Sequence, residues 1–123
     1  MNRPPRGWLA KFGDAFRGLA VAVRTQSSFA AHLPVAAAAV VLAAWLGVTA
    51  VEWCAIALAI GGVLAAEVFN TAIEELARAV GRYPDPGIRD ALDCASAGVL
   101  VAVFAAIAVA LVVFGPRLVA LVA

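Results

Sequence analysis

Three long stretches of this chain contain no charged side chain, and they constrain its fold more than any other feature. These stretches are residues 33–51, 53–66 and 94–116. Hydrophobic residues make up 65% of the sequence and charged residues 14%, whereas soluble domains are about 45–50% apolar and about 25% charged. A chain of 123 residues forms one domain at most. Its single core cannot bury this excess of apolar side chains, so we expect lipid to surround most of the protein.

The charge-free stretches predict membrane-spanning helices, which need about 20 mostly apolar residues each. The first and third stretches are long enough alone, and the second becomes so if its helix continues through Glu67, Asn70 and Glu74. The sequence therefore predicts an all-α membrane protein that forms one domain over residues 1–123. The predicted transmembrane helices are residues 33–48, 51–77 and 92–114, with a loop at residues 78–90.

Residues 8–30 have the pattern of an amphipathic helix that lies in the membrane interface. Large apolar side chains recur there at spacings of three and four, with basic side chains between them. The apolar positions are Trp8, Leu9, Phe12, Phe16, Leu19 and Val23. An anchoring role alone would account for this pattern. No apolar segment precedes residue 33, so we expect no cleavable signal peptide.

The basic residues predict the orientation in the membrane. Five of the nine precede the first predicted span, three lie between residues 78 and 90, and only Arg117 follows the third span. By the positive-inside rule, the N-terminus and the 78–90 loop are expected in the cytoplasm and the C-terminus outside. The turn-forming residues of "GRYPDPGIRD" and of "GPRL" at residues 115–118 are expected to end the second and third spans.

The predicted spans also contain many small residues and two cysteines. Alanine is abundant in all three, and small side chains permit close helix packing in lipid, so we expect a homo-oligomer. Cys54 and Cys94 open the second and third spans and should lie near opposite membrane faces. That separation excludes a disulfide within one subunit. We interpret both as small packing residues.

Polar residues interrupt the second predicted span where burial is costly. Glu67, Asn70 and Glu74 are spaced i, i+3, i+7 and therefore share one helix face. A charged acid at the bilayer centre costs about 2.5–3.5 kcal/mol on insertion scales. Alanine would pack equally well there, so an acid in this position is by default a functional hypothesis.

The third predicted span brings two more oxygen-bearing residues to the same membrane side, Asp93 and Ser96. Taken alone, Asp93 is equally explained by the helix dipole, and Ser96 is better explained by a hydrogen bond to its own backbone. Together with Glu67, Asn70 and Glu74 they form a set of carboxylate, amide and hydroxyl oxygens. Such ligands suit Mg²⁺, which often binds together with phosphate.

Two blocks resemble the signature of the prokaryotic diacylglycerol kinase family, which includes undecaprenol kinases. "EVFNTAIEELARAV" followed by "ALDCASAGVLVA" is similar to E-x-x-N-[ST]-A-I-E … K-D-x-x-S-A-A-V-L, and the likeness extends over nearly the whole chain. The resemblance implies a trimeric kinase of the bacterial inner membrane that does not act on nucleic acid. Such a kinase moves the γ-phosphoryl group of MgATP to the hydroxyl of a membrane lipid.

The resemblance also implies a role for each matching residue. Glu67 matches the proposed general base, and Asn70 matches a neighbour that orients the catalytic site. Glu74 matches a carboxylate that holds Mg²⁺ on the nucleotide, and Asp93 matches an acid near the nucleotide. Ser96 matches a serine near the lipid acceptor, and Phe29 lies in the link where that lipid would arrive.

The chain departs from the family pattern at three positions. A second metal-binding glutamate is replaced by Gln26, which keeps a carbonyl oxygen but loses a charge. The lysine of the K-D pair is replaced by Leu92, and an aspartate by Arg78. A basic residue of the 78–90 loop, namely Arg78, Arg82 or Arg89, is a candidate for the missing positive charge.

These features leave three alternatives to an active lipid kinase. A catalytically impaired relative that binds only lipid or nucleotide is favoured by Gln26 and Leu92. An ion-translocating subunit would need one lone acid near the bilayer midplane, whereas this chain has a cluster. A purely structural bundle leaves Glu67 unexplained. The segment "FAAHL" at residues 29–33 resembles the undecaprenol-type branch more than the diacylglycerol-type branch.

Overall fold

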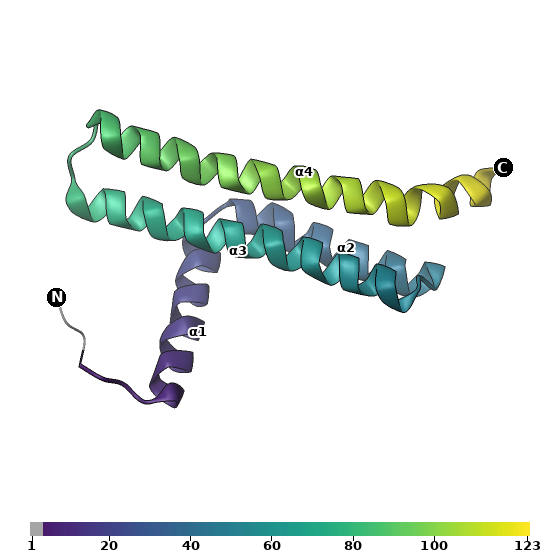
Figure 1. Ribbon diagram of the computed structural model, residues 1–123, viewed down its shortest axis with the longest axis horizontal. Coiled ribbons are helices and arrows are strands. Elements are labelled where there is room, and N and C mark those ends of the chain that lie inside the picture. Colours follow the sequence, from purple (N-terminus) through teal and green to yellow (C-terminus); the bar gives the residue numbers. More distant parts are fainter. Residues whose placement is uncertain (1–3) are drawn as a thin grey trace.

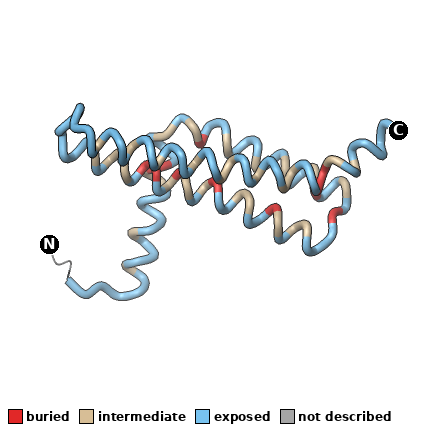
Figure 2. The backbone as a smooth tube through the Cα atoms, turned by 45° about the horizontal axis from the view of Figure 1, so that its top comes forward, coloured by how far each residue is buried: buried red, intermediate tan, exposed pale blue. Residues whose placement is uncertain are grey.

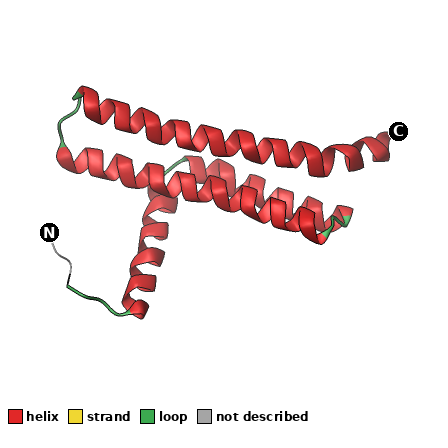
Figure 3. Cartoon of the chain, viewed as in Figure 1, coloured by secondary structure: helices red, strands yellow, loops and turns green. Residues whose placement is uncertain are grey.

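The computed structural model describes residues 4–123, and the regular structure within that range is entirely helical (Figure 3). Short links join four helices (Figure 1). The helices are α1 (Trp8–Thr25), α2 (Ser28–Leu46), α3 (Ala50–Val80) and α4 (Pro86–Val122). The long helices α2, α3 and α4 lie side by side, and α1 lies crosswise to them (Figure 1).

Three of these helices, α2, α3 and α4, are long and apolar enough to cross a membrane. At 1.5 Å per residue, α2 is ~28 Å long, close to the ~30 Å hydrocarbon core of a bilayer. By the same rule α3 is ~46 Å and α4 ~55 Å long. The hairpin of α3 and α4 therefore extends past the corner between α1 and α2 (Figure 1). The helical fold class and the three apolar spans agree with the sequence prediction.

The corner between α1 and α2 lies earlier in the chain than predicted. The interfacial helix ends at Thr25, not at residue 30, and α2 already begins at Ser28 rather than at residue 33. Gln26 is extended, with φ −106° and ψ 119°, and this residue turns the chain from the crosswise α1 into α2. Hydropathy marks only the apolar part of α2, so its polar first turn was missed.

The predicted loop at residues 78–90 is mostly helix. The helix α3 continues to Val80, and α4 begins at Pro86, which leaves only residues 81–85 between them. Gly81 ends α3 in the left-handed conformation, with φ 66°, which glycine adopts without a steric penalty. The Asp85 carboxylate accepts hydrogen bonds from the backbone N–H groups of Gly87 at 2.8 Å and Ile88 at 3.3 Å, and so caps α4.

The predicted end of the last helix at residues 115–118 is also wrong, because α4 continues through Pro116 to Val122. A proline inside a helix removes one backbone hydrogen bond and bends the helix. The last turns of α4 bend away from its axis accordingly (Figure 1). Apolar side chains continue on both sides of Pro116, so the helix resumes after the bend.

Buried residues gather in two regions of the bundle (Figure 2). The apolar core lies near the turn between α2 and α3 and comprises Ala43, Val48, Ile56, Val113 and Phe114. The polar region lies where α1 and the α1–α2 corner meet α3, and it comprises Ala22, Phe29, Glu67, Asn70 and Thr71. The central helix α3 packs against each of the other three and contributes to both regions.

Candidate active site

Glu67 of α3 is the most deeply buried acid of the described chain, with 2% of its surface exposed. His32 places its Nε2 atom 3.0 Å from Glu67 Oε1. Ser28 donates its hydroxyl to Glu67 Oε2 at 3.1 Å. Ser28 and His32 are four residues apart on α2, so they share the face that α2 turns toward α3. One helix thus supplies partners for both oxygens of the carboxylate.

Glu74 lies two turns further along α3, ~10 Å from Glu67 along the helix axis. Gln26 donates its side-chain amide to Glu74 Oε2 across the α1–α2 corner. Asn70 donates its amide to Glu74 Oε1 at 2.8 Å. The sequence placed Glu67, Asn70 and Glu74 on one face of α3, and in the structure that face points at the α1–α2 corner.

Asn70 carries an unmatched oxygen in this polar region. Its residue is 7% exposed, and its Oδ1 atom has no hydrogen-bond partner within residues 4–123. A buried polar atom without a partner costs about 1–3 kcal/mol. The structure therefore leaves an acceptor beside Glu74 that a bound cation, water or ligand would satisfy.

Asp93 and Ser96 do not join this cluster within one chain. Both are exposed, and neither side chain hydrogen-bonds to another residue in the described range 4–123. A groove of about 390 Å³ runs beside Glu74 at the α3–α4 hairpin, and α4 contributes Leu92 to it instead of Asp93. The groove is lined by Glu74, Ala77, Arg78, Tyr83, Ile88 and Leu92.

Phe29, which the family resemblance places in the link where the lipid acceptor would arrive, is buried in the single chain. Only 2% of it is exposed, and it is the largest fully buried side chain in the described part of the protein. Phe29 directly follows Ser28 in the first turn of α2, so it packs the α1–α2 corner. In the single chain this ring is therefore not exposed to lipid.

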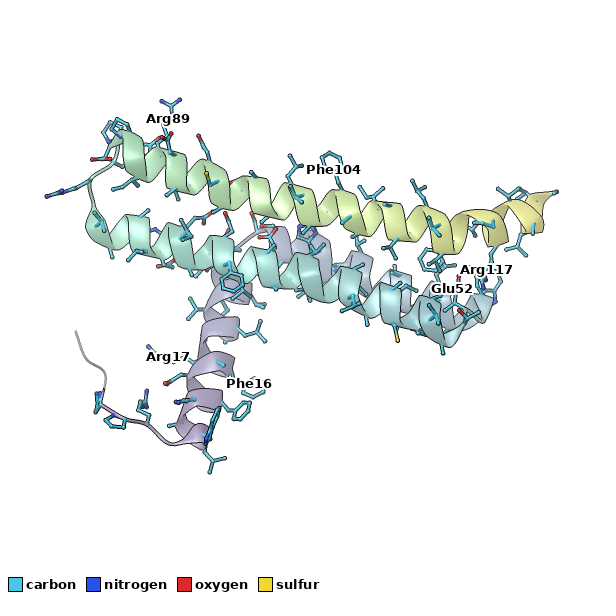
Figure 4. The ribbon with its side chains drawn as sticks, viewed as in Figure 1. Phe16, Arg17, Glu52, Arg89, Phe104 and Arg117 are labelled. Atoms are coloured by element: carbon cyan, nitrogen blue, oxygen red, sulfur yellow. The ribbon has the colours of Figure 1, made fainter. Side chains whose placement is uncertain are left out.

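The three loop arginines differ in their relation to the groove beside Glu74. Arg78 lines the groove and also forms an ion pair with Glu75. Arg89 points away from the bundle (Figure 4). Arg82 lies in the 81–85 link and is exposed. Of the candidates for the missing positive charge, the structure therefore brings Arg78 next to Glu74.

A second, apolar groove reaches His32, the partner of Glu67. It has a volume of about 190 Å³ and is lined by apolar residues of α2, α3 and α4, with His32 as its one polar lining residue. Small alanine side chains from all three helices keep it open, among them Ala36, Ala59 and Ala106. His32 therefore stands between an apolar groove and the buried carboxylate.

The residues around Glu74 fit Mg²⁺ only if the ion brings other ligands with it. No group of three or more His, Cys, Asp or Glu in residues 4–123 is arranged to hold a metal. Glu74 offers one carboxylate, and Gln26 and Asn70 offer amide oxygens. Mg²⁺ commonly binds one or two carboxylates and takes its remaining ligands from water and substrate phosphates. The donor set suits that mode of binding.

The helix α1 presents two chemically different sides at the level of this site. Phe16 projects toward the side on which α2 extends, and Arg17 projects toward the side of the α3–α4 hairpin loop (Figure 4). The large apolar side chains of α1 are exposed, including Trp8 at 75% and Leu9 at 90%. An amphipathic helix with this exposed apolar side suits a membrane interface.

Comparison with known proteins agrees with this arrangement. The sequence model of the prokaryotic diacylglycerol kinase family matches residues 13–114, which include α2, α3 and all the polar residues described above. The chain belongs to the prokaryotic diacylglycerol kinase family. It is also 31% identical to the undecaprenol kinase of Bacillus subtilis (strain 168) over 107 residues, which cover 87% of each chain. Family and relative both point to a lipid kinase, and the apolar helices to a multi-pass membrane protein.

Sequence reasoning included Glu67, Glu74 and the two amide partners of Glu74 among its candidate residues, but it missed the partners of Glu67. Ser28 and His32 were not assigned to the site, although their i, i+4 spacing at the start of an apolar helix was a visible signal. Gln26 was assigned from the family pattern alone, and the structure places it on Glu74. The partners come from another helix, so nothing in the local sequence around Glu67 pointed to them.

Proposed function

We propose that this protein is an ATP-dependent lipid kinase that transfers the γ-phosphoryl group of MgATP to the hydroxyl of a membrane lipid. The observation that supports it best is the buried Glu67 carboxylate, held by an imidazole and a hydroxyl at the level of the amphipathic α1. Burying an acid there costs free energy that packing alone does not repay. At this depth the carboxylate would contact the hydroxyl of a lipid at the membrane interface.

The proposed orientation follows from the basic residues and from α1. The N-terminus and the α3–α4 hairpin would lie on the cytoplasmic side of the bacterial inner membrane and the C-terminus on the outer side. The apolar side of α1, with Phe16, would enter the interface, and Arg17 would face water and phosphate headgroups (Figure 4). The part of the hairpin beyond α1 would then reach the cytoplasm, where ATP is available.

In this reaction Glu67 serves as the general base. The lipid O–H bond breaks, its proton passes to the Glu67 carboxylate, and the oxygen forms a bond to the γ-phosphorus as the bond to ADP breaks. Glu67 then releases the proton to water. General-base catalysis of this kind contributes about 10²–10⁴-fold. Most of the remaining catalysis of phosphoryl transfer comes from positioning and charge neutralisation.

The nucleotide would bind in the groove beside Glu74. Glu74, with Gln26 and the unmatched Asn70 oxygen, would hold the Mg²⁺ that neutralises phosphate charge when it is bound. Arg78 lines the same groove and would supply the positive charge that Leu92 does not. Tyr83 also lines the groove, and its aromatic ring would contact the adenine base of ATP.

The acceptor is proposed to be a lipid of the undecaprenol type. The 31% identity to an undecaprenol kinase supports this choice over diacylglycerol. The apolar groove that ends at His32 offers a place for one hydrocarbon chain whose hydroxyl reaches Glu67.

A homotrimer would complete the site. Asp93 and Ser96 are exposed on α4 in the single chain. A neighbouring subunit could bring them to the nucleotide and the lipid, as the family resemblance implies. The large exposed apolar surface of α3 and α4, including Phe69, Leu100 and Phe104, is available for such packing.

The test is Mg²⁺-dependent transfer of ³²P from ATP to undecaprenol and to diacylglycerol by purified protein in mixed micelles. Wild type should phosphorylate undecaprenol, and Glu67→Gln should not. Glu52→Gln is the matched control, because Glu52 is an acid at the far end of the same helix and pairs with Arg117 outside the site. Absence of transfer from folded wild-type protein would contradict the proposal and would favour a relative that only binds lipid or nucleotide.

A further inference from the structure

Both oxygens of the Glu67 carboxylate are engaged by residues of α2. His32 Nε2 lies 3.0 Å from Oε1, and the Ser28 hydroxyl donates to Oε2 at 3.1 Å. The Glu67 side chain is 3% exposed and that of His32 is 26% exposed, so water cannot substitute freely for either partner. The buried acid therefore depends on α2 for its hydrogen bonds.

The chemistry of the two groups defines which atom carries the proton. When Glu67 is ionised, His32 donates from Nε2 in this contact, because an ionised carboxylate only accepts hydrogen bonds. Two donors four residues apart on one helix fix the plane of the carboxylate, whereas one donor would leave it free to rotate. Glu67 still has free lone pairs, because an ionised carboxylate offers about four acceptor positions.

We propose that His32 is a positioning residue for Glu67, donating from Nε2 so that the carboxylate is aimed at the acceptor hydroxyl. This inference rests on the proposed kinase function. A base acts only within hydrogen-bond reach of the proton that it removes. His32 also lines the apolar groove, so the same side chain lies at the junction of the acceptor's path and the base.

The kinetic test compares two substitutions at this position. His32→Leu keeps an apolar groove lining but removes the donor, and His32→Gln keeps an N–H donor. A hydrogen bond to a charged group contributes about 1.5–3 kcal/mol, so kcat should fall about 10- to 100-fold in His32→Leu. His32→Gln should recover part of that loss, and the KM for MgATP should stay unchanged in both, because Glu74 and its partners are untouched.

The spectroscopic test uses the fact that His32 is the one histidine in the 123-residue sequence. Protein labelled with ¹⁵N-histidine in micelles gives a single imidazole, whose tautomer and N–H proton are read directly by NMR. Wild type should show a protonated Nε2, and Glu67→Gln should move the Nε2 proton resonance upfield, because the amide is a weaker acceptor. Glu75→Gln should leave the resonance unchanged.

Either of two results would overturn the proposal. An unprotonated Nε2, or an imidazole signal insensitive to Glu67→Gln, would mean that His32 does not donate to this carboxylate. Wild-type kcat in folded His32→Leu would mean that the contact does not position the base, while loss of transfer in Glu67→Gln would still support the kinase. If wild type transfers no phosphate, the kinase function fails, and the NMR signal still decides whether the pair exists.

Discussion

Two glutamates on the same helix show how differently the two ends of this bundle use an acid. Glu52, in the first turn of α3, accepts both arms of the Arg117 guanidinium, at 2.6 Å and 2.7 Å (Figure 4). Glu67, four turns further along, has an imidazole and a hydroxyl as partners. A two-pronged ion pair neutralises its carboxylate and ties α3 to α4. Glu67 has no guanidinium partner in the described chain.

The surroundings of Glu52 and Glu67 differ, as their partners do. The Glu52–Arg117 pair borders the apolar core, and both side chains are partly exposed, at 22% and 29%. Glu67 is buried in the polar region beside an unmatched Asn70 oxygen. Glu52, whose charge is neutralised by Arg117, thus lies beside the apolar core. Glu67 has no arginine or lysine partner in the described chain, and its partner His32 lines the apolar groove.

The sharpest test of this contrast makes the same substitution at both acids. Glu67→Gln should lower phosphate transfer by about 10²–10⁴-fold, because the amide cannot take the proton from the lipid hydroxyl. Glu52→Gln should leave the rate near that of wild type, because Glu52 lies at the opposite end of the bundle. Initial rates of ³²P transfer at saturating lipid measure both. Equal losses in the two variants, with helix content and oligomer size unchanged, would end the functional distinction between the acids.

A smaller effect is expected at Asn70. Asn70→Ala removes the donor to Glu74 Oε1 and the unmatched oxygen, so kcat/KM for MgATP should fall about 10- to 100-fold. Thr71→Val is the control: its hydroxyl is buried nearby but bonds only the backbone carbonyl of Glu67, at 2.8 Å. Transfer by Thr71→Val should stay close to that of wild type. An equal loss in both variants would point to general disruption of α3 packing.

The substitution Gln26→Glu places a second carboxylate against Glu74 and tests whether the α1–α2 corner helps to hold Mg²⁺. Two adjacent acids bind Mg²⁺ more tightly, so the concentration that half-saturates transfer should fall about tenfold. Without Mg²⁺ the two charges repel, and the thermal unfolding temperature should drop. Gln26→Ala, which adds no charge, should show no such gain in affinity. An unchanged Mg²⁺ requirement in Gln26→Glu would place the ion elsewhere.

The smallest expected effect lies at the opposite end of the bundle. Arg117→Met leaves Glu52 without its guanidinium and should lower the free energy of unfolding slightly, with no change in transfer rate. Unfolding in mixed micelles by increasing denaturant would measure it. Combined with Glu52→Gln the losses should be less than additive, since both substitutions break one contact. Additive losses would mean that the two residues act independently.

The helices and the acidic stripe of α3 could be predicted because their signals are local. Three charge-free stretches predicted three spans, and the i, i+3, i+7 spacing placed Glu67, Asn70 and Glu74 on one face. Helix ends were predicted poorly where hydropathy stops before the helix does. The turn residues of "GRYPDPGIRD" were expected to end the second span, and Gly81 does end α3, but the first turn of α4 after Asp85 was included in a longer loop at residues 78–90.

The pairings between helices could not be predicted from local patterns, because the paired residues are distant in the chain. Ser28 lies 39 positions from Glu67, and Gln26 lies 48 positions from Glu74. These contacts depend on where α1 ends and on how α2 rotates against α3, and no local pattern reports either. The same reason explains Asp93: its position near the start of α4 was evident, yet the rotation of α4 points Leu92 into the groove.

The sequence by itself indicated that lipid surrounds the protein, and it gave the number of spanning helices and the amphipathic character of α1. It also showed that α3 contains acids whose burial costs free energy. Each of these follows from residue type and spacing within one helix. Only the tertiary structure decided that Ser28 and His32 hold Glu67, that Gln26 reaches Glu74, and that Arg117 closes on Glu52. Such pairings arise from the packing of separate helices, whose rotation and offset depend on all the side chains between them.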